Sequence, residues 1–329
     1  MQSNVGSRAF QNARLQKKLK KQADALLPAA MAAYRAGRHG EAQSLCRRLL
    51  QDLPTCFDAM QLLGVSVCAC GEFEEARHIF ERVVALDRGS ADAHCNLGFA
   101  LLNLKRYDDA RASLERAIAL RPNFQIAQRN LAMALLRLGL AEPAIAAFTR
   151  AIELKPDDAE AWSNRAVAEL RARHWDAAAI SAERALALQP RYFEALVNKG
   201  QAHLELRHFE VAEAAFNTAI AARPEMADVL ADRGRLYMLT GRIDQAAADF
   251  DASVAREPSL EPGWQGKAQI SMLRGDMAQA IVACKRVLAQ NPAAEVALTL
   301  LGGCLGRLGD AAGAIAHFDQ ALAIRPDYD

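Results

Sequence analysis

Residues 125–158, QIAQRNLAMALLRLGLAEPAIAAFTRAIELKPDD, contain a pattern that recurs every 34 residues. Its most visible mark is Pro156. Because proline cannot continue a helix, a proline at a fixed spacing marks the end of each structural repeat. Eight of the nine positions on this spacing are proline and one is arginine: Pro54, Arg88, Pro122, Pro156, Pro190, Pro224, Pro258, Pro292 and Pro326.

Small residues recur inside each repeat. If the spaced proline is repeat position 32, position 20 is alanine in all nine repeats, and position 8 is glycine or alanine. In residues 125–158 these are Ala144 and Ala132, which would let two helices approach closely, with Phe148 at position 24 as the bulky filler. Gly139, at position 15, is one of six glycines there and predicts a left-handed helix end. Each repeat is therefore expected to be a pair of helices.

On these residues the chain resembles the tetratricopeptide repeat family over residues 23–328. The resemblance implies an all-α, right-handed superhelical solenoid of helix-turn-helix repeats, with the first helix of each repeat on the concave surface. Arg88, Arg165 and Lys199 depart from the family pattern, and Pro28 lies inside the first helix, which makes the start of the array irregular. The expected division is a basic leader, helical or disordered, at 1–22, followed by nine repeats at 23–56, 57–90, 91–124, 125–158, 159–192, 193–226, 227–260, 261–294 and 295–328.

Composition narrows the class of protein. Hydrophobic residues make up 52% of the chain, yet no apolar run approaches the roughly 20 residues that a membrane span needs, and no signal peptide pattern opens the sequence. The seven cysteines follow no disulfide framework spacing. These features predict a cytoplasmic protein.

Charge is unevenly placed. Residues 1–22 hold six basic residues and no acid, which leaves 34 basic and 39 acidic residues, a net charge of −5, for the array. An acidic array argues against a nucleic acid groove. The leader itself could contact phosphate or an anionic lipid surface, or it could be a solvated helix that caps the first repeat.

Several groups of residues imitate catalytic or metal sites. Cys68 and Cys70 are two residues apart on a helix, so their side chains point in nearly opposite directions and are expected to be small apolar fillers. Trp162 and Trp264 share repeat position 4 and are expected to pack in the core. One stretch resembles a glycine-rich phosphate-binding loop, but no strand precedes it and no Lys-Ser or Lys-Thr pair follows it: Gly302, Gly303, Gly306 and Gly309. No catalytic, cofactor or metal site is therefore expected.

A polar residue, asparagine, recurs at position 6 of the first helices in four successive repeats. Because positions 2, 6, 9 and 13 step by four, three and four residues, they form one stripe along a helix. Asparagine costs helix stability relative to alanine, and its amide can donate to and accept from the backbone of an extended peptide. The alternative is inheritance from a common ancestral repeat. The series consists of Asn96, Asn130, Asn164, Asn198 and then Asp232.

The neighbours of this series describe a groove with apolar pockets and a few cations. A clamp for a chaperone's terminal carboxylate is disfavoured, because Asp92 and Glu160 are among the acids at position 2. The candidate peptide-binding residues beside the series are Phe99, Met133, Arg129, Arg137 and Arg171.

Three functions follow, each a binding function without catalysis in this chain. The first is a protein interaction scaffold that binds extended segments. The second rests on the similarity of the asparagine series to the arm of O-linked N-acetylglucosamine transferases and SPINDLY-like proteins, and makes the chain the substrate-recognition part of such an enzyme. The third is anion or nucleic acid binding through the leader.

The end of the sequence adds one expectation. Asp329 would be the first residue of a tenth repeat, so the chain is expected to be a fragment, or its open end to be covered by a second copy. Leu298 and Leu322 are expected to be partly exposed at that end, and self-association is expected to follow.

Overall fold

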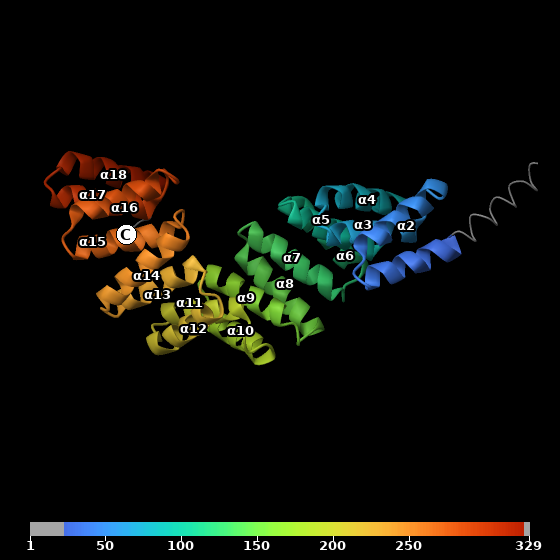
Figure 1. The fold of residues 1–329 in the computed structure, drawn as a ribbon, viewed down its shortest axis with the longest axis horizontal. Helices are drawn as coiled ribbons and strands as arrows, with labels where there is room; N and C mark the ends of the chain where they lie inside the picture. The colour runs from blue at the N-terminus through green and yellow to red at the C-terminus, as the bar shows by residue number, and fades with distance from the viewer. Residues whose placement is uncertain (1–22, 326–329) are drawn as a thin grey trace, which may run out of the picture. The chain divides into compact units, whose positions relative to one another are not determined.

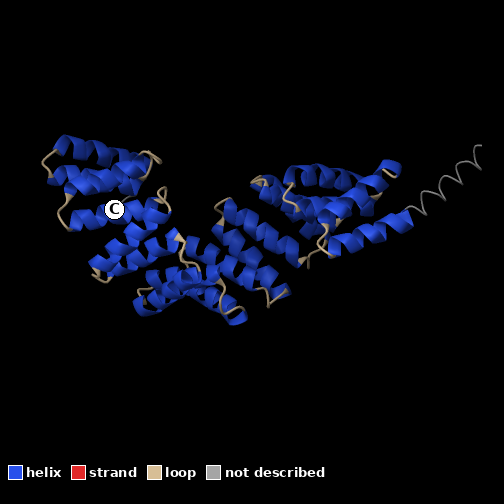
Figure 2. Ribbon diagram, in the orientation of Figure 1, coloured by secondary structure: helices blue, strands red, loops and turns tan. Residues whose placement is uncertain are grey.

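The computed structural model describes residues 23–325, and every regular element in that range is a helix (Figures 1 and 2). The expected all-α class is confirmed. Residues 23–35 form a helix that runs through Pro28 without a break. The helices that follow are α2 (His39–Asp52), α3 (Phe57–Ala69), α4 (Phe73–Leu86), α5 (Ala91–Asn103), α6 (Tyr107–Leu120), α7 (Gln125–Arg137), α8 (Ala141–Leu154), α9 (Ala159–Arg171), α10 (Trp175–Leu188), α11 (Phe193–Glu205), α12 (Phe209–Ala222), α13 (Ala227–Leu239), α14 (Ile243–Arg256), α15 (Glu261–Leu273), α16 (Met277–Leu288), α17 (Glu295–Arg307) and α18 (Ala311–Ile324).

The chain divides into two compact units, with the division inside α9 between Ala168 and Glu169. Within each unit the helices pack in pairs joined by short turns, such as α5 with α6 and α13 with α14. The first helix of a pair also packs against the first helix of the next pair, as α3 does on α5 and α13 does on α15. These first helices therefore form a continuous layer inside each unit, which is the layer that carries repeat position 6.

A left-handed residue ends the first helix of every described pair. The six glycines expected there all have positive φ, which confirms the prediction. In the other three pairs Lys105, Arg173 and Arg207 adopt the same conformation, with φ of 61°, 61° and 60°. Non-glycine residues pay a steric cost there, because Cβ crowds the backbone. The six glycines are Gly37, Gly71, Gly139, Gly241, Gly275 and Gly309.

The core confirms the expected pairing of small and large side chains. A Cβ added to Gly64 would lie 2.5 Å from the ring of Phe80, and one added to Gly98 would lie 2.5 Å from Leu114. The alanines at position 20 are all buried, which confirms that they lie at the contact between the two helices of a pair. Position 24 is filled by a buried phenylalanine in four pairs: Phe80, Phe148, Phe216 and Phe250.

The two tryptophans at position 4 each brace the preceding turn. The Trp162 indole nitrogen donates to the carbonyl oxygen of Pro156 at 2.9 Å, and Trp264 donates to Pro258 at 3.0 Å. Both side chains are half-buried. A hydrogen-bonded indole nitrogen with a packed ring is a structural arrangement, and it explains why tryptophan recurs at this position.

Two expectations about exposure were wrong. Leu298 is only 3% exposed, because it occupies position 4, the side of the first helix that packs toward the preceding turn. Cys70 is exposed at the end of α3, so it is not a core filler, whereas Cys68 is half-buried against the core.

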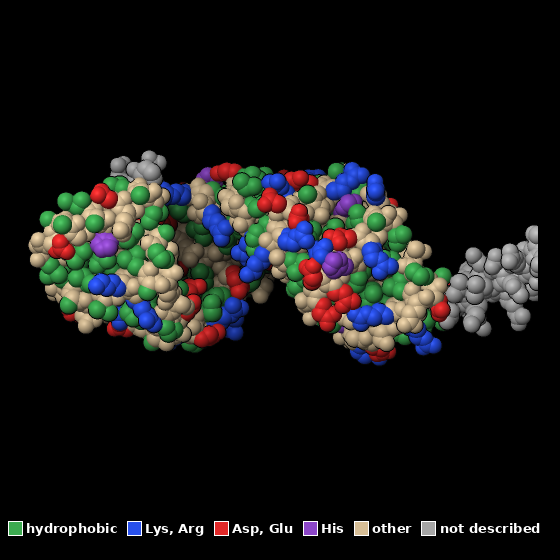
Figure 3. Space-filling model, turned by 90° about the horizontal axis from the view of Figure 1, so that it is seen from above, with side chains coloured by type: hydrophobic (Ala, Val, Ile, Leu, Met, Phe, Trp, Pro, Cys, Tyr) green, Lys and Arg blue, Asp and Glu red, His purple; other side chains and the backbone are tan. Residues whose placement is uncertain are grey.

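The last helix carries an apolar face. Leu322 is 45% exposed, as expected, and Ile315 and Phe318 are exposed beside it. In Figure 3 hydrophobic side chains gather with few charges between them at the left, where α17 and α18 lie. Among the described residues no helix follows α18 to cover this face.

A candidate peptide-binding surface on the first helices

The first helices of the N-terminal unit enclose two adjoining cavities. One, of about 290 Å³, lies against α3 and α5, and the other, of about 470 Å³, extends toward the helix at 23–35. Asn96 and Val65 line both cavities, so the hollows meet beside the first asparagine of the series. The remaining lining is largely apolar, which is the usual character of a ligand pocket. Its members include Leu27, Met31, Tyr34, Leu62, Phe80 and Phe99.

The asparagine amides of this unit have capacity for further hydrogen bonds. Asn96 donates one long hydrogen bond, 3.4 Å, to Gln61. Asn130 is only 7% exposed, yet among residues 23–325 its side chain has no hydrogen-bond partner, and neither has half-buried Asn164. Neither amide is sealed from solvent, since the fully buried side-chain nitrogens without a partner in residues 23–325 belong to His39 and His203. Both amides can therefore exchange water for a ligand's donors and acceptors. A peptide backbone lying on these helices would supply the missing donors and acceptors.

The aromatic candidate Phe99 is available to a ligand. Phe99 is 41% exposed, and its ring contacts Phe73 edge to face, with ring centroids 6.2 Å apart. Met133 is half-buried and packs against the core around Phe148. Phe99 therefore offers an apolar surface, while Met133 contributes mainly to packing.

The candidate arginines differ in their surroundings. Arg129 bridges Asp158 at 3.3 Å and Glu160 at 2.9 Å, so its charge is already matched. Arg137 is exposed and, in the described part of the chain, makes no ion pair. Arg171 lies at the end of α9, in the C-terminal unit, and is exposed. Of the two candidate arginines in the N-terminal unit, Arg137 is thus the one whose charge is open to a ligand.

The C-terminal unit carries the rest of the series. Asn198 is buried on α11, and Asp232 is half-buried on α13, where it accepts a hydrogen bond of 2.7 Å from Gln201. Burial raises the pKa of Asp232 to about 6. A third cavity, of about 240 Å³, lies beside this carboxylate.

Sequence reasoning missed a row of polar links at position 7. Lys199 forms an ion pair of 3.0 Å with Glu183, Arg233 donates to Asn217 at 2.6 Å, and Lys267 pairs with Asp251. In each case the partner lies 16 residues earlier, on the second helix of the preceding pair. The sequence held one indication of this row, because Lys199 departs from the family pattern at position 7. This row ties neighbouring repeats together on a side of the first helices next to, and distinct from, the side that carries position 6.

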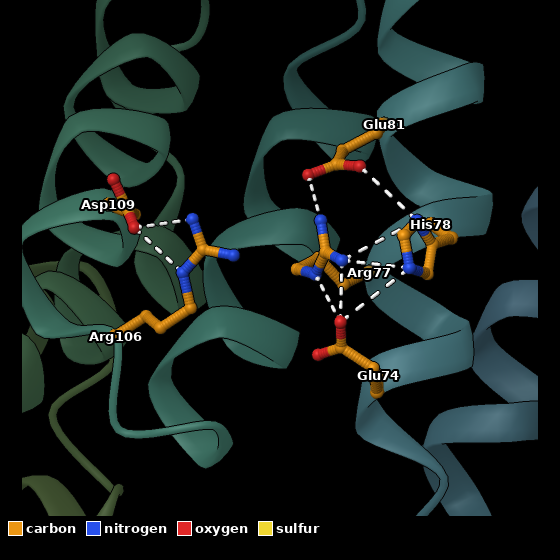
Figure 4. A network of polar contacts seen from close by, with 6 residues as sticks. All are labelled: Glu74, Arg77, His78, Glu81, Arg106 and Asp109. Atoms are coloured by element: carbon orange, nitrogen blue, oxygen red, sulfur yellow. Dashed lines mark hydrogen bonds and ion pairs between the residues drawn. The ribbon is translucent and has the colours of Figure 1, made fainter.

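A charged network on α4 imitates a functional site but is matched within itself. Arg77 contacts Glu74 and Glu81, each at 2.5 Å, and His78 lies within 3.7 Å of both acids, as Figure 4 shows. The hydrogen bond from Arg77 lowers the pKa of Glu74. Nearby, Arg106 pairs with Asp109. Because each charge has an opposite partner at the surface, this network is a solvated face of a helix.

Residues 23–325 give no support for a metal site or for a membrane-spanning helix. No three His, Cys, Asp or Glu side chains gather there as ligands for a metal ion. None of these helices is long and apolar enough to cross a membrane.

Comparison with known proteins agrees with this arrangement. Two models described as tetratricopeptide repeat match the chain, one at residues 100–159, 129–193 and 197–261, the other at 33–94, 69–123 and 271–329. The matches cover most of the sequence, so the chain belongs to the tetratricopeptide repeat family. No curated protein sequence matches it.

Solved structures share the fold. A chain in the crystal structure of the APC/C hetero-tetramer Cut9-Hcn1 is 19% identical, with a TM-score of 0.64, over 87% of this chain and 56% of that one. PilW, a type IV pilus biogenesis factor, is 24% identical, with a TM-score of 0.57, over 64% of this chain and 98% of its own. A tetratricopeptide repeat protein from Parabacteroides merdae is 16% identical, with a TM-score of 0.63, over 76% and 98%.

All three neighbours are less than 25% identical to this chain. The chain spans little more than half, 56%, of the first of these neighbours. At such identities the likeness concerns the fold, and function has to be argued from the site. The class of protein is nonetheless defined: a tetratricopeptide repeat scaffold, of the kind that mediates contacts between proteins.

Proposed function

We propose that this protein binds extended segments of partner proteins on the layer of first helices, through the amides at repeat position 6. The observation that carries the proposal is the state of Asn130, an amide that is 7% exposed and has no partner in the described part of the chain. Its neighbour Asn96 opens onto two cavities. An extended backbone presents the amide hydrogens and carbonyl oxygens that these side chains need.

The apolar lining fits side chains of the bound segment. Phe99 and Met31 are both exposed at the cavities beside Asn96, so alternate side chains of an extended peptide could bury apolar surface there. Amides bind any backbone, so the pockets would set the preference. A scaffold of this kind needs no catalytic group of its own.

The test replaces Asn96, Asn130, Asn164 and Asn198 together by alanine. Each net hydrogen bond contributes roughly 0.5–1.5 kcal/mol, so affinity for short immobilised peptides should fall by about 2–6 kcal/mol if the effects add. Asn123, which lies in a turn off this stripe and is exposed, provides the same change as a control in a single alanine variant. Unchanged affinity in the quadruple variant would show that the series is inherited packing.

The finer assignment to a glycosyltransferase arm stays a prediction. The asparagine series that suggested it supports a general peptide-binding surface equally well. The basic leader at 1–22, proposed for anions, lies outside the described residues.

A further inference from the structure

The asparagine series ends at an unusual pair of residues. Asp232 occupies position 6 of its repeat, and Gly266 occupies the same position of the next one. Both line the cavity of about 240 Å³ in the C-terminal unit, between α13 and α15. A Cβ at residue 266 would collide with the ring of Phe250, which also lines this cavity. The Phe250 ring therefore occupies the place that a side chain at position 6 of this repeat would take, and the same ring forms one wall of the hollow beside Asp232.

The carboxylate has one oxygen in use and one available. Oδ2 of Asp232 accepts the hydrogen bond from Gln201, whereas within residues 23–325 Oδ1 has no hydrogen-bond partner. Burial has removed much of the water that would stabilise its charge, as the raised pKa of Asp232 shows. A cationic donor entering the cavity would restore that stabilisation with a charge-assisted hydrogen bond.

The charges around the cavity favour a cation. Arg235 lines it and lowers the pKa of Asp232, but it pairs with Glu205 of α11 at 2.7 Å, and the charge of Glu205 raises that pKa. Asp228, on the same helix as Asp232, adds a second negative charge that raises the pKa of Asp232. From α15 the cavity receives only the neutral amides of Gln265 and Gln269. Acids thus outnumber cations near the carboxylate.

The walls suit a long side chain with a charged end. Met238, Leu239 and Pro262 line the cavity together with Phe250. Apolar walls leading to a carboxylate match the methylene stem and charged head of lysine or arginine. We propose that this cavity binds a lysine or arginine side chain of the bound partner segment, which gives the scaffold a preference for basic residues at one position. This inference rests on the proposed function, since the segment has to lie on the first helices.

The experiment measures binding of short immobilised peptides that differ only in lysine or norleucine at each position in turn. At about pH 8 we expect lysine at one position to bind roughly tenfold more tightly than norleucine. Asp232→Asn restores the residue of the series and should bring that ratio near one, while its affinity for the norleucine peptides is retained. Glu210→Gln is the matched control, because Glu210 is exposed on α12 and, in the described residues, has no partner.

Acid supplies a second readout. Protonation of Asp232 should remove the lysine preference of the wild type as pH falls through about 6, and Asp232→Asn should show no such change. Melting curves of both variants establish that the fold is kept. Peptides that bind without a lysine preference, or a preference that Asp232→Asn leaves intact, would overturn this inference alone. If no peptide binds the wild type at all, the proposed function fails as well.

Discussion

Arg233 donates two hydrogen bonds of 2.7 Å to the carboxylate of Asp249, one from Nε to Oδ2 and one from Nη2 to Oδ1. Both side chains are largely buried. The third nitrogen, Nη1, donates to Asn217 at 2.6 Å. One guanidinium thereby joins α12, α13 and α14. Such a forked pair fixes geometry as well as charge.

Breaking this pair should destabilise the C-terminal unit. Because removal of Arg233 leaves the Asp249 carboxylate buried without its partner, we expect Arg233→Met to lower the free energy of unfolding by about 3 kcal/mol. Arg274→Met is the control, since its pair with Asp244 is exposed and should contribute less than about 1 kcal/mol. Urea unfolding of both variants compares the two losses. Equal losses would contradict the distinction between buried and exposed pairs.

The raised pKa of Asp232 predicts how stability depends on pH. Its folded pKa of about 6 lies above the ordinary value of 3.8, so the folded state binds the proton more tightly than the unfolded state does. This contribution to stability is fully present below the ordinary value and is lost as pH rises through about 6. Asp232→Asn should therefore raise the free energy of unfolding by about 1–3 kcal/mol at pH 8 and change it little at about pH 4. A gain of equal size at both pH values would contradict this.

The fold was predictable because its determinants are local and repeat. Gly139 and the other glycines at position 15 predict positive φ directly, and that conformation is observed. Gly64 predicts a close approach of the two helices of its pair, and the Phe80 ring packs against it. Pair partners were not predictable in the same way. That Lys199 would meet Glu183, 16 residues earlier on the adjacent helix, depends on how consecutive repeats pack.

The candidate site was predictable only in part. The spacing placed Asn96 and Asn130 on one helical stripe, but it could not show that Asn96 borders two cavities or that Asn130 is buried without a partner. The cavity at Asp232 was not predictable from the sequence either, because its walls depend on how the Phe250 ring packs against Gly266. Leu298 shows the converse, because it lies on the face of its first helix that packs inward, which sequence position alone does not distinguish from an open face.

The three strained turns offer a stabilisation test. Lys105, Arg173 and Arg207 hold positive φ, and among the described residues their side chains make no polar contact, while their backbone N–H groups stay hydrogen-bonded. Replacing each by glycine should stabilise the protein by roughly 0.5–1 kcal/mol, because relief of the left-handed strain outweighs the entropy that glycine adds to the unfolded chain. Gly139→Ala should destabilise by about 1 kcal/mol for the same reason. Thermal unfolding measures both, and a lower melting temperature for the glycine variants would contradict the account.

Two glycines on first helices should respond oppositely to the same substitution. A Cβ at Gly200 would collide with the ring of Phe216, whereas one at Gly306 would meet only the Cβ of Ala314, at 3.7 Å. We expect Gly200→Ala to cost about 1–3 kcal/mol through overpacking. Gly306→Ala should stabilise by up to about 1 kcal/mol, because alanine favours a helix interior. Denaturant unfolding measures the free energy of both variants. Equal effects would mean that the Phe216 ring moves aside without cost and would contradict the prediction.

The apolar face of α18 predicts self-association. Ile315, Phe318 and Leu322 are spaced by three and four residues, so they lie on one side of the helix, and all three are exposed. An exposed apolar surface of this kind favours contact with a second copy. We expect the mass measured by sedimentation equilibrium to rise with concentration for the wild type.

Charged substitutions on that face should keep the protein monomeric. Ile315→Lys with Leu322→Lys disrupts the apolar stripe, and Ile180→Lys with Val282→Lys is the matched control, because these two residues are exposed on other helices. The control should associate as the wild type does, since its apolar residues are isolated from one another. A wild type that stays monomeric at every concentration, or a control pair that abolishes association as fully as the α18 pair, would show that this face does not drive contact between copies.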